Sequence, residues 1–190
     1  DLNDAQQNIV TNYLAAKYNR TIANDVYQYD VAYGHEVAGI GREDVQNVHA
    51  YAQSGNILQI GDADSLDNGE YLLFGHNGRD ISSWQLDASI GGYRLNRFWC
   101  LDETGDVGNV KIHFDLSGKS INDPDSLVLL IDSDDGNFDN ASLHSQGLAY
   151  NSGVVSFTNV NLNSGDCITV GSKSNSDPLP VELIKFDAAV

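Results

Sequence analysis

The chain has 190 residues, of which 41% are apolar, including 9 tyrosines and 6 phenylalanines, so it can fold as one generous domain with a real core. Its 27 acidic and 10 basic residues give a formal net charge of −17, which disfavours nucleic acids and anionic membrane surfaces as partners because both are negatively charged. No apolar run approaches the roughly 18 residues of a membrane-spanning helix, so we expect no membrane insertion.

The first residues predict the one convincing helix of the chain. Apolar side chains recur at spacings of three and four over DLNDAQQNIVTNYLAAKY, and the helix is expected to end near Tyr18. Asn3 followed by Gln6 is a capping-box arrangement, in which each side chain accepts a hydrogen bond from a backbone N–H at the helix start. The apolar face is expected to dock on a sheet of the same molecule or on a neighbouring molecule. Its members are Leu2, Ala5, Ile9, Tyr13, Leu14 and Ala16.

From Asn24 onward, short segments rich in β-branched and aromatic residues alternate with clusters of Gly, Asn, Asp and Ser, which is typical of an all-β domain. The predicted strands are Val26–Tyr33, Ile57–Ile60, Tyr71–Gly75, Tyr93–Leu101, Val110–Leu116, Leu127–Ile131, Val154–Leu162, Cys167–Gly171 and Val181–Phe186. They favour an antiparallel two-layer β-sandwich, jelly-roll or Ig-like, with one N-terminal α-helix. We expect residues 1–20 to form the helix, 21–172 the sandwich, and 173–190 a linker and C-terminal strand.

The stretch YGHEVAGIGRED, residues 33–44, begins like the zinc-protease helix motif. That motif needs a second histidine four residues after the first, so that both imidazoles lie on one helix face. Gly39 stands at that position, and Gly34 and Gly41 add to the helix-breaking character. We therefore interpret the stretch as a turn-rich connection between strands and predict no zinc site there.

The chain has two cysteines, Cys100 and Cys167, which lack the CxxC spacing of metal or redox sites. In a secreted protein they would form one disulfide, and in a cytosolic protein two buried thiols; we favour the disulfide. The chain begins with Asp1 and contains no methionine, so we expect a processed or excised piece from which a leader has been removed.

The stretch IDSDDGNFDN is the strongest local signal for a bound ion. Oxygen-bearing side chains crowd the end of a predicted strand, and calcium prefers such ligands. The glycine comes one residue too early for an EF-hand loop, so the alternatives are a compact calcium turn of another kind and a plain Asx-rich hairpin. The candidate calcium ligands are Asp132, Asp134, Asp135, Asn137 and Asp139. A weaker candidate comprises Asp62, Asp64, Asp67, Asn68 and Glu70.

Catalytic motifs are not evident. The sequence contains no G-x-S-x-G elbow, and GHNGRD lacks the lysine of a phosphate-binding loop. Asp102 and Glu103 are neighbours on a predicted strand, where their side chains would point to opposite faces and could not act on one glycosidic bond. We therefore predict that the chain is not an enzyme.

Six blocks in a fixed order carry a family resemblance: NIVTNYLAAKYN, VAGIGREDVQN, LLFGHNG, RFWCLDETGDVGNVKIHFDL, LVLLIDSDDGNFDNA and LPVELIKFDA. In this order they resemble a β-rich module of large secreted Bacteroidetes surface proteins, which follows a laminin-G-like domain and precedes the sorting domain of type IX secretion. The resemblance spans nearly the whole chain. It implies export to the cell surface, implies no established catalytic activity, and makes the leading helix and the LPVEL strand junctions with neighbouring domains.

The expected function is a non-enzymatic extracellular structural or adhesive module of the bacterial cell surface. Its partners would be neighbouring domains or copies of itself, assembled into a filament by strand addition of the C-terminal segment. The side chains that would fill pockets are Leu179, Val181, Leu183, Ile184 and Phe186. The alternative is a glycan-binding accessory module, for which Trp84 in a polar stretch is the best contact, whereas Trp99 alternates with Leu95 and Leu101 and is expected in the core.

Overall fold

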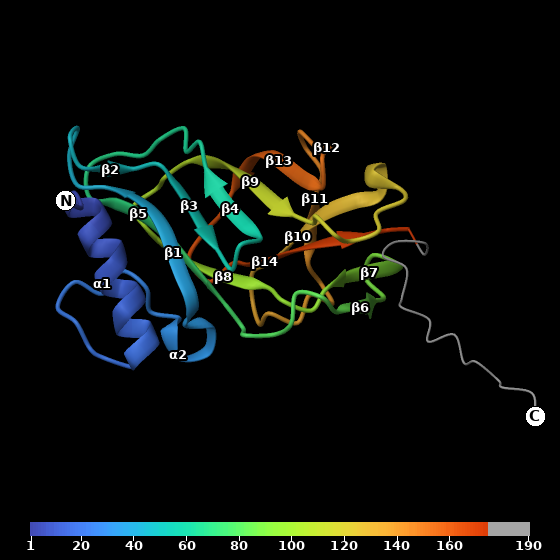
Figure 1. Cartoon of the computed structure of the whole chain (residues 1–190), viewed down its shortest axis with the longest axis horizontal. Coiled ribbons are helices and arrows are strands. Elements are labelled where there is room, and N and C mark those ends of the chain that lie inside the picture. The colour runs from blue at the N-terminus through green and yellow to red at the C-terminus, as the bar shows by residue number, and fades with distance from the viewer. Residues whose placement is uncertain (175–190) are drawn as a thin grey trace, which may run out of the picture.

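The computed structural model describes residues 1–174, which form two antiparallel sheets packed face to face with an N-terminal helix at one end (Figure 1). The larger sheet has nine strands, in the order β11 (Ser142–His144), β10 (Leu127–Asp132), β14 (Cys167–Ser172), β8 (Trp99–Thr104), β5 (Glu70–His76), β1 (His35–Arg42) and β2 (Val48–His49), with β7 (Gly92–Leu95) attached to β14 and β6 (Trp84–Asp87) to β7. The smaller sheet has five, in the order β12 (Ala149–Asn151), β13 (Val154–Asn161), β9 (Asn109–Asp115), β4 (Leu58–Gly61) and β3 (Tyr51–Ser54). The prediction of an all-β antiparallel sandwich is confirmed.

The main core lies between the two sheets and follows the period-2 pattern of the strands. In β9, Val110, Ile112 and Phe114 are buried, while Lys111 and His113 are only half-buried on the other face. The inward residues of β9 belong to the same core cluster as Ile40 and Leu72 of the larger sheet, so this cluster has members from both sheets. The alternation of apolar and polar residues therefore predicted the inner and outer faces of β9 correctly.

The helix α1 (Asp4–Tyr18) covers the outer face of the larger sheet. Its start carries the predicted capping box: Gln6 N–H donates to Asn3 Oδ1 at 2.9 Å, and Asn3 N–H donates to Gln6 Oε1 at 3.1 Å. Ala5 and Ile9 pack against β1 and β5 in a small apolar cluster of their own. The predicted stripe is confirmed only in part, because Leu2 and Leu14 are exposed.

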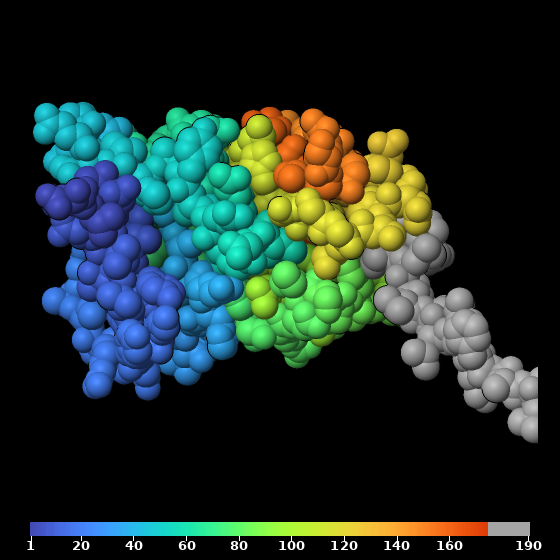
Figure 2. All heavy atoms as spheres, viewed as in Figure 1, coloured from blue at the N-terminus to red at the C-terminus, as the bar shows by residue number. Residues whose placement is uncertain are grey.

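The two ends of the described chain lie far apart along the longest axis of the molecule. Figure 1 shows the N-terminus beside α1 at one end, whereas β14 runs toward β6 and β7 at the other. Figure 2 shows the same division on the surface, with the atoms of α1 and of the segment after it forming one end of the molecule. Among residues 1–174, no helix is both long enough and apolar enough to cross a membrane.

The predicted strand Val26–Tyr33 is wrong. Its second half is the short helix α2 (Asp30–Tyr33), and its first half has no strand partner. Side chains satisfy the backbone there instead: Asn12 Oδ1 accepts from Val26 N–H at 2.9 Å, and Asp25 Oδ1 accepts from Tyr27 N–H at 3.1 Å. The apolar residues of this segment therefore fill the space under α1 without joining a sheet.

The predicted turn block at residues 33–44 is a second error, because most of it is the eight-residue strand β1. β1 lies between β2 and β5 in the larger sheet. Its glycines allow close contact with the next strand: a Cβ added at Gly41 would lie 2.1 Å from Cδ1 of Tyr71, and one at Gly39 would lie 2.7 Å from Cγ of Leu73. Glycine here permits close packing of side chains from β5 over the backbone of β1.

The remaining predicted strands match with small shifts. The prediction Tyr93–Leu101 corresponds to two strands, β7 and β8, with residues 96–98 between them. The other segments between residues 57 and 172 coincide with β4, β5, β9, β10, β13 and β14. A short 3₁₀ helix, Pro124–Ser126, precedes β10. The predicted strand Val181–Phe186 and the five assembly residues within 179–186 lie outside the described residues.

Candidate functional site

The acidic loop, residues 132–140, begins at Asp132, the last residue of the buried strand β10. Alternate residues of β10 share a face, so Val128, Leu130 and Asp132 point away from the smaller sheet, toward a second apolar cluster that contains both cysteines. Asp132 lies opposite Cys167 of β14. Its side chain is buried, with 1% of the residue exposed, so the strand places a carboxylate in the wall of the molecule beside the cysteine pair.

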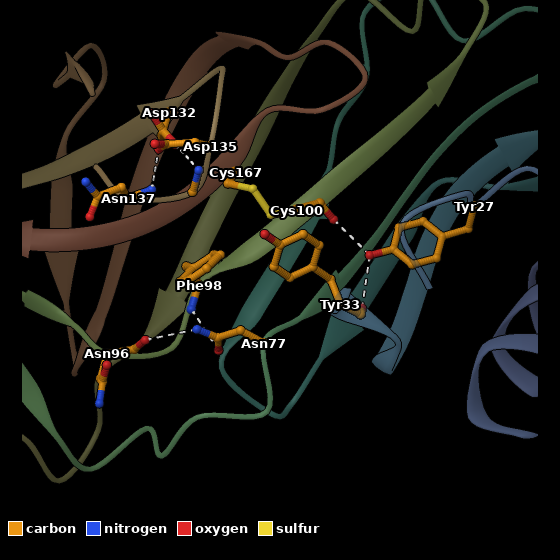
Figure 3. Close-up of a disulfide and its surroundings, with 11 residues drawn as sticks. Tyr27, Tyr33, Asn77, Asn96, Phe98, Cys100, Asp132, Asp135, Asn137 and Cys167 are labelled. Carbon is orange, nitrogen blue, oxygen red and sulfur yellow. Dashed lines mark hydrogen bonds between the residues drawn. A yellow bond between two sulfur atoms is a disulfide. The ribbon is translucent and has the colours of Figure 1, made fainter. Parts of the chain in front are cut away.

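Three of the five predicted calcium ligands come together. One carboxylate oxygen from each of Asp132, Asp134 and Asp135 lies within 4.8 Å of the other two. Figure 3 shows the carboxylates of Asp132 and Asp135 close to each other, next to the disulfide. Asp139 is exposed and lies outside this group, and Asn137 donates its backbone N–H to Asp135 Oδ1 at 2.9 Å. We call Asp132, Asp134 and Asp135 the aspartate triad.

A phenylalanine inside the loop fixes its path. Phe138 is completely buried, has a left-handed backbone with φ of 67°, and packs edge to face on Phe98 with ring centroids 5.3 Å apart. The guanidinium of Arg94 lies over the Phe138 ring at 4.6 Å and donates to the backbone oxygen of Asn137 at 3.3 Å. Arg94 is held in turn by Asp87, from Nε to Oδ2 at 2.7 Å. Sequence reasoning missed this support, although one aromatic residue in an otherwise polar loop is a signal for it.

The charges of the aspartate triad are unevenly stabilised. Burial raises the pKa of Asp132 above its ordinary value; the N–H of Gly136 opposes that shift and the carboxylate of Asp134 adds to it. The side-chain amide of Asn140, which donates to Asp134 Oδ2 at 2.8 Å, holds the pKa of Asp134 below its ordinary value. Among residues 1–174, none of the ion pairs includes a member of the triad.

Two hollows open on either side of the aspartate triad. The larger, about 340 Å³, is walled by the rings of Tyr29 and Tyr33, by the disulfide, and by Asp134 and Asp135. The smaller, about 180 Å³, is lined by Ser133, Asp134 and neighbouring polar residues. The two tyrosines were predicted to lie in a strand, so their place beside the acidic loop was not foreseen. An ion or small ligand could reach the triad through either hollow.

Cys100 and Cys167 form a disulfide, as predicted. They lie directly opposite each other on β8 and β14 and are both buried. The hydroxyl of Tyr27 lies 3.1 Å from the backbone oxygen of Cys100 and 3.0 Å from that of Tyr33 (Figure 3). The disulfide therefore sits between the acidic loop on one side and the segment under α1 on the other.

Trp84 and the weaker acidic candidate, which were also predicted to bind ligands, are not part of the aspartate-triad site. Trp84 is half-buried and packs against the main core, and its indole N–H has no hydrogen-bond partner within the described part of the chain. Its role as a glycan contact stays a prediction. Trp99 is completely buried, as predicted. In the weaker acidic candidate, Asp64 accepts hydrogen bonds from the backbone and side-chain nitrogens of Asn109 at 2.7 and 2.9 Å, so its oxygens hold two loops together.

Glu36 of the zinc-like stretch takes part in a hydrogen-bond network at the start of β1, and His35 stacks beside it. His76 Nδ1 accepts from Gly78 N–H at 2.9 Å, so the neutral ring carries its hydrogen on Nε2, which lies 2.9 Å from Glu36 Oε2. The ring of His35 stacks on His76 with centroids 5.5 Å apart. Glu36 itself has a left-handed φ of 48° at a bulge of β1, and Arg97 Nη1 lies 3.7 Å from its carboxylate.

We expect this network to make folding stability depend on pH through His76. Burial lowers the pKa of His76; Glu36 opposes the shift, and the charges of Arg97 and His35 add to it. Because the folded-state pKa lies below the unfolded value of about 6.5, the unfolded chain binds more protons below that pH, and the stability contributed by neutral His76 is lost as the pH falls. Urea unfolding at several values from pH 7.5 to 5 should show a steeper loss for the wild type than for His76→Gln.

The variant serves as the control for every other group that titrates in the same range. The remaining histidines and the overall negative charge act equally in both proteins, so the difference between their free energies of unfolding isolates His76. Parallel pH profiles for the two proteins would show that His76 has the same proton affinity in the folded and unfolded chains.

Comparison with known proteins identifies a family and no individual relative. Neither the curated proteins nor the solved structures contain a match to the chain. One family matches residues 6–166, which include most of α1, Cys100 and the whole acidic loop. Its description is a domain of unknown function, DUF8202. Since the match covers most of the sequence, the chain belongs to this family.

Proposed function

We propose that the chain is a non-enzymatic structural or adhesive module of the bacterial cell surface, linked end to end to neighbouring domains or to copies of itself. Such a module holds its two neighbours a fixed distance apart, which requires a stable fold with well-separated ends. Export by the type IX route, as in the Bacteroidetes surface proteins that the sequence resembles, is part of the proposal.

The observation that carries the proposal is the separation of the two ends. α1 and the N-terminus occupy one end of the longest axis, and β14 runs toward the other, where the described chain ends at residue 174 (Figure 1). A module inserted between neighbours in this way spans the distance between them. Termini side by side would instead suit a domain that branches from a single attachment point.

The disulfide and the net charge support the proposal in two different ways. The Cys100–Cys167 disulfide is a bond that persists in oxidising compartments and is rare in reducing ones. The formal net charge of −17 favours solubility and repulsion between freely diffusing copies. Association between copies then requires a specific contact, and the C-terminal segment LPVELIKF supplies the strand pattern for one.

We expect deletion of residues 178–190 to abolish end-to-end assembly. The deleted segment would add as a strand to a neighbouring copy, with backbone hydrogen bonds and with Val181 and Leu183 of one strand face filling pockets. Electron microscopy and light scattering of the native material should show chains or filaments for the full chain, and single modules for the deletion variant. A head-to-tail contact of this kind extends into a filament unless its rotation closes a ring.

The control is deletion of residues 187–190 alone, which removes the residues after the predicted strand and leaves LPVELIKF intact. It should assemble like the full chain. A full-length chain that stays monomeric at high concentration would contradict self-assembly, and equal assembly of all three proteins would place the contact elsewhere.

A further inference from the structure

We propose that the aspartate triad, Asp132, Asp134 and Asp135, is a binding site for one calcium ion. The inference is independent of the assembly proposed above, since the triad lies at the end of β10 and in the connection to β11, not in the C-terminal segment. One oxygen from each of the three carboxylates lies within 4.8 Å of the others. At that separation all three can contact one ion at the calcium–oxygen distance of about 2.3–2.6 Å.

The buried member of the triad is the observation that distinguishes this site from an acidic turn. Asp132 is 1% exposed, and its buried Oδ1 accepts no hydrogen bond from any of residues 1–174. A buried carboxylate oxygen without a donor or cation is costly, because it has lost its water and gained nothing in exchange. Asp132 lies in the wall behind two exposed carboxylates, so a cation placed among the three would supply the missing partner.

Hydrogen bonds hold each carboxylate of the triad in place. Asp132 Oδ2 accepts from the N–H of Gly136, Asp134 Oδ2 accepts from Asn140 at 2.8 Å, and Asp135 Oδ1 accepts from the N–H of Asn137 at 2.9 Å. These donors fix the orientation of the ligands before any ion arrives, as supporting hydrogen bonds do in metal sites generally. The loop itself is fixed from beneath by Phe138, which is completely buried.

Among residues 1–174, no basic side chain forms an ion pair with the triad. The charge of Arg94 acts on Asp132 through space, but its guanidinium is paired with Asp87 at 2.7 Å. Three carboxylates so close together repel one another unless a proton or a cation lies between them. A divalent cation removes this repulsion at neutral pH.

The chemistry of the ligands favours calcium over other divalent cations. Carboxylate oxygens are hard ligands, which suit calcium and magnesium and not the softer transition metals. Magnesium demands a near-ideal octahedron and gives up its water reluctantly, whereas calcium accepts irregular sets of six to eight oxygens. The hollows of about 340 and 180 Å³ beside the triad leave room for water to complete the shell and for the ion to enter.

The test is calorimetric titration of calcium chloride into the full chain after removal of divalent ions with a chelator. We expect one ion per chain. Asp134→Asn and Asp135→Asn should each weaken binding at least tenfold, because each removes one charged ligand at an exposed position that the core does not depend on. At a hundredfold excess of calcium over Kd, the melting temperature of the wild type should rise by roughly 5–10 °C, and magnesium chloride should give a smaller rise.

Asp139→Asn is the matched control, since Asp139 belongs to the same loop, is exposed and carries the same charge, but lies outside the triad. It should bind calcium like the wild type. Circular dichroism on each variant confirms that it is folded. Superimposable melting curves with calcium and with chelator would overturn the proposal, as would equal losses of affinity in all three variants, which would indicate only general attraction to a negative surface.

Discussion

Replacing Trp99 by alanine should lower the free energy of unfolding by about 3–5 kcal/mol, the range expected for a completely buried tryptophan. Trp99 belongs to β8 of the larger sheet, and its side chain contacts two residues of the smaller one. Its Nε1–H donates to Ser54 Oγ on β3 at 3.0 Å, and its ring meets Phe114 of β9 at 5.8 Å and an interplanar angle of 63°. The substitution would therefore leave a cavity between the sheets and remove a hydrogen bond across them. Chemical denaturation measures the loss.

Trp84→Ala is the matched control, because it makes the same chemical change at the only other tryptophan of the chain. Trp84 is half-buried at the edge of the core, and none of the described residues bonds to its indole N–H, so the loss should be clearly smaller. Each variant retains one tryptophan, whose fluorescence follows unfolding. Equal losses in the two variants would contradict the assignment of Trp99 as the residue that joins the sheets.

Loss of the disulfide should have an effect of similar size. Cys100 and Cys167 are 67 residues apart in the sequence, and a cross-link that closes a loop of this length restricts the unfolded chain enough to contribute about 4 kcal/mol. The double variant Cys100→Ala, Cys167→Ala should therefore unfold at a much lower urea concentration than the oxidised wild type. Urea unfolding followed by fluorescence gives the difference.

Comparison with reduced wild type distinguishes the effect of losing the disulfide from the effect of the smaller alanine side chains. The wild type should lose most of its advantage when reduced, whereas the double variant should be indifferent to reductant. Intact mass before and after reduction shows whether the bond is present in the purified protein. Two free thiols in the native protein, or a wild type that is insensitive to reductant, would argue against a structural disulfide between β8 and β14.

Regular elements were predictable from the sequence where one physical rule dominated. The capping box at Asn3 and Gln6 located the start of α1 correctly, and alternation located β9 correctly because one face of that strand is buried and the other is not. The failures occurred where side chains from distant segments decide the backbone. Val26 resembles a strand residue, but its N–H bonds to Asn12, and no local pattern reveals that contact.

Glycine misled the reading of β1 for a related reason. Glycine occurs both in turns and in strands that another chain segment approaches closely. At Gly41, only the position of Tyr71 across the sheet shows that the second case applies. The short strands β3, β6, β11 and β12 were missed because three or four residues carry too little periodicity.

The acidic loop was recognised by composition, but its membership was only partly predictable. Asp132, Asp134 and Asp135 converge, whereas Asp139 does not. Between the triad and Asp139 lies Phe138, which is buried and has a left-handed backbone that turns the chain at that point. The number of oxygen-bearing residues in a segment does not predict such a turn of the backbone.

The position of the disulfide also gives the module a mechanical property. If the chain is pulled from its two ends, tension on the C-terminal side first reaches the end of β14 at Ser172, which is hydrogen-bonded to β7 and β10. Peeling of that strand can proceed only as far as Cys167, where a covalent bond transfers the load to β8 in the middle of the larger sheet. Extension from this end is thus limited to the residues after Cys167. At the opposite end, the described contacts of α1 are apolar packing and hydrogen bonds, without a covalent cross-link.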